Sequence, residues 1–432
     1  MRSLSTTDSA SHRLIVFSYV TAMLMLLVAP FPSSAGLRGV LLLLSASALA
    51  ALYFRAREAS QRIFLHSPSR LCIGAVVAWV ISVALFSAFG PDPRTSLSAW
   101  RADVLTPVLA CGIFYALTTT RRDLMRFSLV LLIGLVVLSV MVVFDPFRPD
   151  DPTRAALYGG VGRVTMWFNT LAALLPLAWL APRRWRTLSR FGGGLAIAEL
   201  LIGTWYSGNR AAWAAYVAML MAGTITAVWS AKPRGISLRA LWGVIALLAL
   251  LSAGFYASST YRANVHTGDL DAPVEFLMKD NRLAIWRVAS DMITEKPWAG
   301  HGYDLAQVGD EFTNRLSDPG LKGWIRHAHN VLLDYAIQMG AIAAAILAIL
   351  FLALLREFWR LAGAEKNERD QVARVAAICG VALVTGVFMR NMLDDFFSRH
   401  MILLFGALLG MLLGLASRDG SSRKLQAVQA RI

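Results

Sequence analysis

The feature of this sequence that most constrains its fold is a series of apolar stretches, each close to the length that crosses a lipid bilayer. A spanning helix needs about 20 predominantly apolar residues, because the hydrocarbon core is ~30 Å thick. Twelve such stretches cover residues 14–30, 37–54, 71–89, 103–118, 127–144, 165–181, 193–207, 211–230, 240–257, 329–355, 373–390 and 400–416. Hydrophobic residues make up 56% of the chain, more than the core of a soluble domain can hide. We therefore predict an all-α polytopic membrane protein with about twelve transmembrane helices.

The distribution of lysine and arginine predicts the orientation of these helices. Twelve crossings place both termini on the same side of the membrane. With the N-terminus in the cytoplasm, the cytoplasmic segments hold 25 of the 42 Lys and Arg residues, as the positive-inside rule requires. Eight of the others fall in one long outer loop, to which the rule does not apply. We expect both termini in the cytoplasm, with the first apolar stretch retained as a span and not cleaved as a signal peptide.

The net charge of +15 does not by itself indicate a nucleic-acid partner. Most of it follows from the orientation and from contact with anionic membrane lipids, so we expect membrane lipids and no nucleic acid.

The three cysteines lie inside predicted spans without metal-ligand spacing and are interpreted as packing residues. Acidic pairs at 149–151, at 269–271 and at Asp394 and Asp395 lack a second ligand set. We interpret them as caps, turns or arginine partners, and expect neither a metal nor another cofactor.

One long polar interruption divides the chain. The predicted parts are 1–256 with nine spans, 257–328 as an outer loop, 329–416 with three spans, and 417–432 as a cytoplasmic tail. Within the loop, residues 280–304 space their apolar side chains as an amphipathic helix does. Asp280 is placed to cap this helix, and Pro297, Gly300 and Gly302 to end it. Because long ordered loops usually carry function, we expect the helix to lie over the outer face of the bundle.

Polar residues near membrane depth gather at four places, all on the outer side. Ionisable side chains cost free energy in a bilayer, so they mark candidate functional positions. The four groups are Arg210 before the eighth span, Arg282 and Arg287 in the loop helix, Arg326, His327, His329 and Asn330 at the start of the tenth span, and Arg390 with Arg399 between the last two spans. Guanidinium groups stay charged and fit phosphate oxygens. If the groups converge, they would bind a phosphorylated lipid; alternatively, each arginine anchors a headgroup or braces a loop.

His329 stands where the polar loop meets the tenth span, in "GWIRHAHNVLLDYAIQMG". A neutral imidazole is a natural general base near neutral pH; the alternative is an interfacial histidine that only reaches water. Eleven residues, about three helical turns, separate His329 from Gly340. We therefore expect the two to share a helix face, with the glycine admitting a neighbouring helix. Asp334 is placed to hydrogen-bond near Asn330 or to face a wet cavity.

Three blocks of this sequence resemble a known superfamily. "RHAHNVLLDYAIQMG" resembles the periplasmic signature of the O-antigen ligases (the WaaL family) through His329, Asn330 and Gly340. "NRLAIWRVASDMITEKPWAGHGY" resembles a block of the wider ligase and polymerase superfamily through Arg282, Trp286, Pro297, Gly300 and Gly302. "GNRAAW" is similar to the Ser-Arg-Gly/Ala turn of that superfamily, with Asn209 in place of the serine. The sequence departs from the ligase pattern at Ala343, where ligases usually have Gly, Thr or Tyr.

The resemblance implies a metal-independent, inverting glycosyltransferase of the GT-C type in the bacterial inner membrane, with its site facing the periplasm. It would transfer O-antigen polysaccharide from undecaprenyl diphosphate to the lipid A-core oligosaccharide. His329 would act as general base, while Arg210 and Arg282 would stabilise the diphosphate leaving group. The further substrate contacts that we predict are Arg287, Asn330, Trp286, His327, Arg326, Arg390 and Arg399.

Three alternatives stay open at this point. An O-antigen polymerase would use the same donor with another lipid-linked repeat as acceptor, and a protein O-oligosaccharyltransferase would use a Ser or Thr side chain. A lipid-carrier flippase or transporter would need charged residues along the membrane midplane, whereas the centres of most predicted spans are apolar. The oligomeric state is not indicated by the sequence.

Overall fold

The computed structural model describes most of the predicted spans. The described residues are 9–29, 34–55, 68–144, 170–175, 194, 197, 201, 204–205, 210–230, 238–267, 282–319, 321–322, 325–363, 371–394 and 399–417. They form helices and turns, with no strand among them. The predicted sixth and seventh spans lie largely outside these residues, as do the acidic pairs at 149–151 and 269–271 and the proposed cap Asp280.

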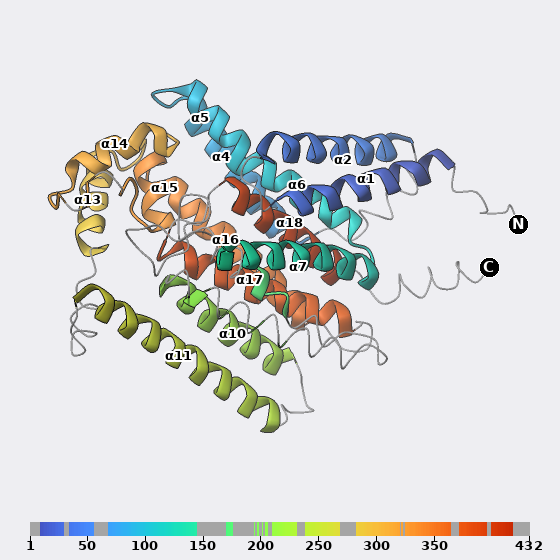
Figure 1. The fold of residues 1–432 in the computed structure, drawn as a ribbon. Coiled ribbons are helices and arrows are strands. Elements are labelled where there is room, and N and C mark those ends of the chain that lie inside the picture. The colour runs from blue at the N-terminus through green and yellow to red at the C-terminus, as the bar shows by residue number, and fades with distance from the viewer. Residues whose placement is uncertain are drawn as a thin grey trace, which may run out of the picture.

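The long helices lie side by side in one bundle (Figure 1). From the N-terminal half they are α1 (Ser9–Val28), α2 (Ala35–Arg55), α4 (Arg70–Ala88), α6 (Thr106–Leu117) and α7 (Arg121–Phe144). From the C-terminal half they are α10 (Arg210–Ser230), α11 (Leu238–Thr267), α16 (Ala341–Gly363), α17 (Gln371–Asn391) and α18 (Arg399–Ala416). Among the described residues, seven helices are long and apolar enough to cross a membrane. The chain is therefore a multi-pass helical membrane protein, as predicted.

The fourth predicted span begins ten residues earlier than expected, and it contains a π-helical turn. Pro93–Leu117 forms one stretch made of α5 (Pro93–Trp100), the π turn η2 (Arg101–Leu105) and α6. Pro107 lacks the N–H that would bond to the carbonyl of Asp103, so the α-helical pattern cannot continue there. The backbone N–H of Thr106 instead donates to the carbonyl of Arg101, five residues back. Hydropathy does not reveal this irregularity, because the turn leaves the composition of the span unchanged.

The tenth predicted span is two helices, which corrects one expectation. Gly340 separates α15 (Val331–Met339) from α16, and its φ of +86° is a conformation that favours glycine. A Cβ at this position would lie 2.3 Å from the carbonyl oxygen of Trp298. Gly340 therefore does not share a helical face with His329. The segment that packs closely against Gly340 is the turn at Trp298, and not a neighbouring helix. Sequence spacing was wrong here because it assumed an unbroken helix.

The turn after the loop helix is fastened to this break by backbone hydrogen bonds. The N–H of His301 donates to the carbonyl of Ile337 over 2.8 Å, and that of Gly302 to Gln338 over 3.0 Å. In return, the N–H of Ala341 donates to the carbonyl of Pro297 over 2.8 Å. These bonds satisfy backbone groups that the end of α15 and the start of α16 leave without helical partners. The turn at 297–302 thus sets the position of the outer loop on the bundle.

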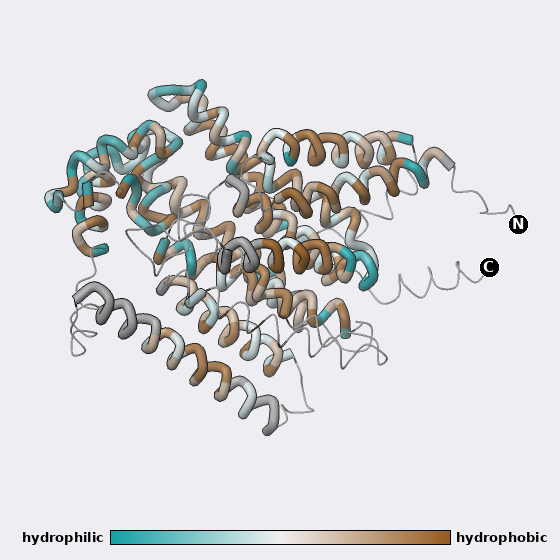
Figure 2. Tube along the Cα trace, in the orientation of Figure 1, coloured by the Kyte–Doolittle hydropathy of each residue, from teal (hydrophilic) through white to brown (hydrophobic). Residues whose placement is uncertain are grey.

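The outer loop contains the predicted amphipathic helix, α13 (Arg282–Glu295), together with α14 (Leu305–Arg315). The side chains of Ile285, Ala289 and Met292 are buried against α14 and the start of α15. Arg315 hydrogen-bonds to Glu295, which lowers the pKa of that carboxyl. Figure 2 shows hydrophilic residues concentrated on α13 and α14, in contrast to the apolar bundle.

The ninth predicted span extends beyond its predicted end. Its apolar part is Ile245–Ala257, yet the helix α11 continues to Thr267. Hydropathy marks the membrane boundary, whereas a helix ends where capping and propensity end it. The boundary placed at residue 256 therefore does not coincide with the end of a helix.

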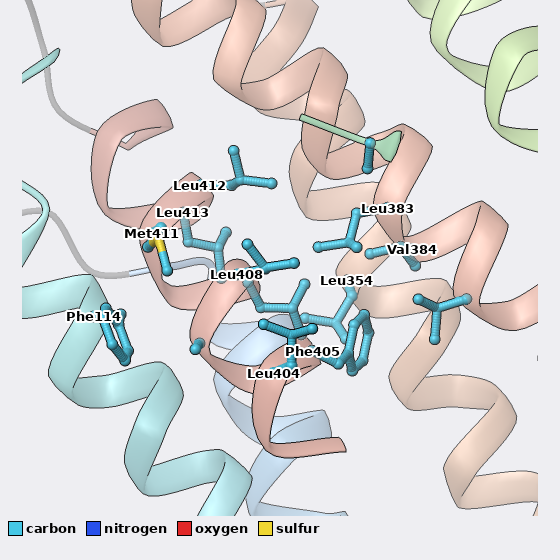
Figure 3. Packing of buried hydrophobic residues seen from close by; sticks show 14 of the residues in the cluster. Phe114, Leu354, Leu383, Val384, Leu404, Phe405, Leu408, Met411, Leu412 and Leu413 are labelled. Carbon is cyan, nitrogen blue, oxygen red and sulfur yellow. The ribbon is translucent and has the colours of Figure 1, made fainter. Parts of the chain in front are cut away.

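The helices α6 and α18 approach each other closely. Cβ atoms added at Gly406, Gly410 and Gly414 would lie 2.3, 2.2 and 2.6 Å from backbone carbonyl oxygens of α6. Small residues at four-residue spacing let two membrane helices approach until their backbones touch. The other faces of α18 carry leucines such as Leu404, Leu408 and Leu412, which pack in the core with Phe114 of α6, Leu354 of α16 and Leu383 of α17 (Figure 3).

Candidate functional site

The site is built around the sharp turn that begins α15. Asn330 caps this helix, and its side-chain oxygen accepts from the N–H groups of Leu332 and Leu333 over 3.0 and 3.2 Å. His329 precedes the cap with a φ of +51°, an uncommon conformation for a residue with a side chain. The side-chain amide of Asn330 donates to the carbonyl of Met392, just after α17, over 3.4 Å. Asn330 thus holds two segments together that lie 62 residues apart in the sequence.

That connection brings His329 to an acidic residue. The Nδ1 atom of His329 lies 3.2 Å from Oδ1 of Asp394, and the other carboxylate oxygen accepts from Nη2 of Arg390 over 2.9 Å. Arg390 is completely buried, whereas the side chains of His329 and Asp394 keep 22% and 19% exposure. An ionised carboxylate only accepts hydrogen bonds, so this contact favours the tautomer of the neutral ring in which Nδ1 donates and Nε2 is the free acceptor. This arrangement suits a base that takes a proton from a hydroxyl group.

A second arginine lies within electrostatic range of Arg390. Arg282, the first residue of α13, lies close enough to Arg390 for their positive charges to repel each other. The Tyr216 side chain of α10 lies within electrostatic range of Arg390, and Arg210 begins α10 less than two turns earlier. Arginine side chains of α13 and α17 therefore lie at the end of the bundle around His329, and guanidinium groups suit an anionic group.

A second set of contacts supports the histidine from the loop side. The backbone N–H of His329 donates to Nδ1 of His327 over 3.2 Å, and the two rings lie 4.1 Å apart. One carboxylate oxygen of Asp334 accepts from the N–H of Ala328 over 2.6 Å, so this aspartate holds the turn next to Asn330, as one of its two predicted roles requires. The indole N–H of Trp286 donates to the carbonyl of Ala328 over 3.0 Å, which ties α13 to the same turn.

The structure does not bring all the predicted residues together. Arg326 is half exposed and pairs with Asp310 of α14 over 2.7 Å, and Arg287 lies on the exposed face of α13. Arg210 and Arg399 are the first residues of α10 and α18, but their side chains lie outside the described part of the chain. Substrate contact by any of these residues stays a prediction.

The residue that sequence reasoning missed is Asp394. The sequence indicates that Asp394 and Asp395 are caps, turns or arginine partners. The hydrogen bond from Arg390 to Asp394 confirms the last interpretation for Asp394. Its contact with His329 joins residues 65 positions apart, and no local pattern reports such a contact. Among the residues that the structure describes, no group of three His, Cys, Asp or Glu side chains is arranged to hold a metal ion.

The fold and this cluster define a class: a multi-pass helical membrane protein with a histidine–aspartate–arginine site at one end of its bundle. Residues 195–348 match the model of the O-antigen ligase family, which confirms the resemblance of the motifs over this part of the chain. The matched residues include His329 and Arg282 and end before Arg390 and Asp394. A general O-oligosaccharyltransferase of Acinetobacter baylyi is 31% identical over 71 residues, which are 16% of this chain and 12% of that protein.

Proposed function

We propose that this protein is an O-antigen ligase of the bacterial inner membrane. It transfers polysaccharide from undecaprenyl diphosphate to the lipid A-core oligosaccharide at the periplasmic face, as a metal-independent GT-C type enzyme. The observation that carries the proposal is the cluster of His329, Asp394, Arg390 and Arg282 at one end of a membrane bundle. The match to the O-antigen ligase family supports the same class of reaction.

In this mechanism the basic side chains bind the donor. The diphosphate gains negative charge as the bond between the anomeric carbon and the phosphate oxygen breaks. Arg282 stabilises this charge, with Arg210 as a second donor from α10. Preorganised donors of this kind are commonly worth about 3–4 kcal/mol each in the transition state. Fixed guanidinium groups supply the positive charge that many other glycosyltransferases take from a divalent metal.

His329 acts on the acceptor. Its Nε2 atom takes the proton from an acceptor sugar hydroxyl, whose oxygen attacks the anomeric carbon from the face opposite the diphosphate. The new glycosidic bond forms with inversion, and the imidazolium is stabilised by Asp394 through Nδ1. Arg390 holds Asp394 in place through its hydrogen bond, so it acts as a positioning residue. Both substrates are lipids, which is consistent with a site at the end of the membrane bundle.

The test is transfer in a host that lacks its own ligase and makes rough lipopolysaccharide. We expect the gene to restore long-chain lipopolysaccharide and His329→Ala to abolish it at unchanged protein level. Changed polymer length without attachment to lipid A-core would identify a polymerase instead. Activity that disappears in excess EDTA would contradict the metal-independent mechanism.

A protein O-oligosaccharyltransferase is the second candidate, favoured by the similarity to the Acinetobacter baylyi protein. It would use the same donor, the same arginines and the same base, with a serine or threonine hydroxyl as acceptor. The two candidates separate in one experiment, because glycan would appear on periplasmic proteins and not on lipid A-core. That outcome would overturn the ligase while leaving the proposed chemistry of the site intact.

A further inference from the structure

The bundle contains a second feature that the proposed reaction does not use: an apolar cavity of about 230 Å³ between α4, the η2–α6 segment, α16 and α18. Its walls are almost entirely hydrocarbon, with Val76, Phe351, Phe405 and Leu409 among the lining residues. Ile73 and Val77 line it as well and are exposed on the outer face of α4. The cavity therefore opens sideways, toward the surface that a bilayer would cover.

The cavity lies beside the irregular part of the fourth span. The π turn at Arg101–Leu105 displaces the helix locally, and Asp103, Val104 and Pro107 from this region line the cavity. Gly406 of α18, which packs against the backbone of Pro107, lines the cavity as well. A π turn inside a membrane helix often marks a functional position.

The length of the cavity matches one leaflet of a bilayer. Along α4 it is lined from Pro68, just before the helix, to Trp79 near its middle. Eleven residues of helix correspond to about 16 Å, and half of the hydrocarbon core is ~15 Å thick. One fatty acyl chain, inserted from the Pro68 end, would extend over this distance.

Basic side chains lie at the end where such a chain would begin. Arg70 opens α4 and is exposed, two residues after Pro68. Arg360 of α16 is half exposed and pairs with the buried Glu357, and both lie within electrostatic range of Cys72, a lining residue. The pair Arg360–Glu357 is neutral, so Arg70 supplies the net positive charge, which attracts anionic lipid headgroups.

This end of α4 lies far from the catalytic site. The opposite end of α4 is followed by α5, which contacts the outer loop. The Ser96 hydroxyl of α5 donates to the carbonyl of Tyr303, and the Gln307 amide of α14 donates to Ser96. The 19 residues of α4 separate Arg70 from that end by about 28 Å. A headgroup at Arg70 is therefore not the donor diphosphate held near Arg282.

We propose that this cavity binds one acyl chain of an anionic glycerophospholipid, whose phosphate lies against Arg70. The lipid comes from the leaflet on the Arg70 side and fills the space beside the π turn in the bundle. It fixes α4 and the η2–α6 segment against α16 and α18, and it is not a substrate.

The experiment uses the full-length protein in phosphatidylcholine nanodiscs that contain a small fraction of phosphatidylglycerol with a photoactivatable acyl chain. After illumination, mass spectrometry maps the labelled peptides. We expect the label on α4, α6 and α18, and we expect excess unlabelled phosphatidylglycerol, but not phosphatidylcholine, to remove it. Arg70→Gln should lower this headgroup preference about five-fold, whereas Arg55→Gln, at the exposed end of α2, should leave it unchanged.

Val76→Trp, which fills the cavity, should remove the label, and Ile225→Trp on the exposed face of α10 should not. The competition on the unmodified protein decides the question even if Val76→Trp fails to fold. Label spread evenly over the exposed faces of α2 and α10 would contradict the proposal. So would competition by a polyprenyl diphosphate and not by phosphatidylglycerol, because the cavity would then hold the chain of the donor.

Discussion

Nδ1 of His329 and Oδ1 of Asp394 lie 3.2 Å apart, although one residue precedes α15 and the other follows α17. The contact favours the tautomer in which Nδ1 donates to the carboxylate, and Nε2 is then available as an acceptor. Arg390 fixes the carboxylate from inside the bundle. The chemistry proposed for His329 therefore depends on how two distant helices pack.

The role of Asp394 is tested by Asp394→Asn, which keeps the size of the side chain and removes its charge. An amide can donate to Nδ1, so the proton moves to Nε2 and the base is lost. We expect the rate of glycan transfer in membrane vesicles, normalised to folded protein, to fall by about 10²–10⁴-fold. Thermal stability should fall as well, because the buried Arg390 loses its charged partner. A rate within threefold of the unmodified protein would remove Asp394 from the mechanism.

Arg390 is predicted to contribute to stability through Asp394. Arg390→Leu leaves the aspartate without its buried partner, and we expect a loss of about 2–3 kcal/mol in the free energy of unfolding, limited by the partial exposure of Asp394. The double variant Arg390→Leu with Asp394→Leu should regain most of this stability, since no unpaired charge remains, and stay inactive. Unfolding in detergent measures the first effect and vesicle transfer the second. An active double variant would show that the pair is only structural.

The contact between α6 and α18 predicts a pair of matched alanine substitutions. Gly410→Ala places a methyl group 2.2 Å from the carbonyl oxygen of Cys111, so the two helices must separate, at a cost of about 1–3 kcal/mol. Gly112→Ala, on α6, meets nothing within 4 Å and should be neutral or slightly stabilising. Melting temperatures in detergent compare the two. Equal destabilisation would argue against the close approach.

Gly340→Ala tests the break between α15 and α16. The substitution is strained because of the positive φ, by about 1–3 kcal/mol, and its methyl group collides with the carbonyl oxygen of Trp298. We expect the turn at 297–302 to detach and the amides of His301 and Gly302 to exchange hydrogen faster. Gly39→Ala, with open space around it, serves as control. Unchanged exchange in both variants would mean that the turn is held by other contacts.

Much of the fold was predictable because the local composition of a segment indicates whether it can span a membrane. The starts and ends of α10, α17 and α18 lie within three residues of the predicted spans, since an apolar run of bilayer length is helical whatever surrounds it. The amphipathic helix α13 was visible for a similar reason, as its buried residues recur at helical spacing. His329 and Arg282 were recognisable as candidates because ionisable side chains near membrane depth cost free energy, so their presence indicates a function.

Other features depended on contacts between segments that are distant in the chain. The glycine at 340 ends a helix because the turn at Trp298 occupies the space beside it, and the apolar run around it gave no sign of a break. Asp394 meets His329 where the side chain of Asn330 bonds to the carbonyl of Met392, which joins the start of α15 to the end of α17. Periodicity and hydropathy describe one helix at a time. The pairing of a base with its carboxylate is set by how α15 packs against the end of α17, which is a property of the assembled bundle.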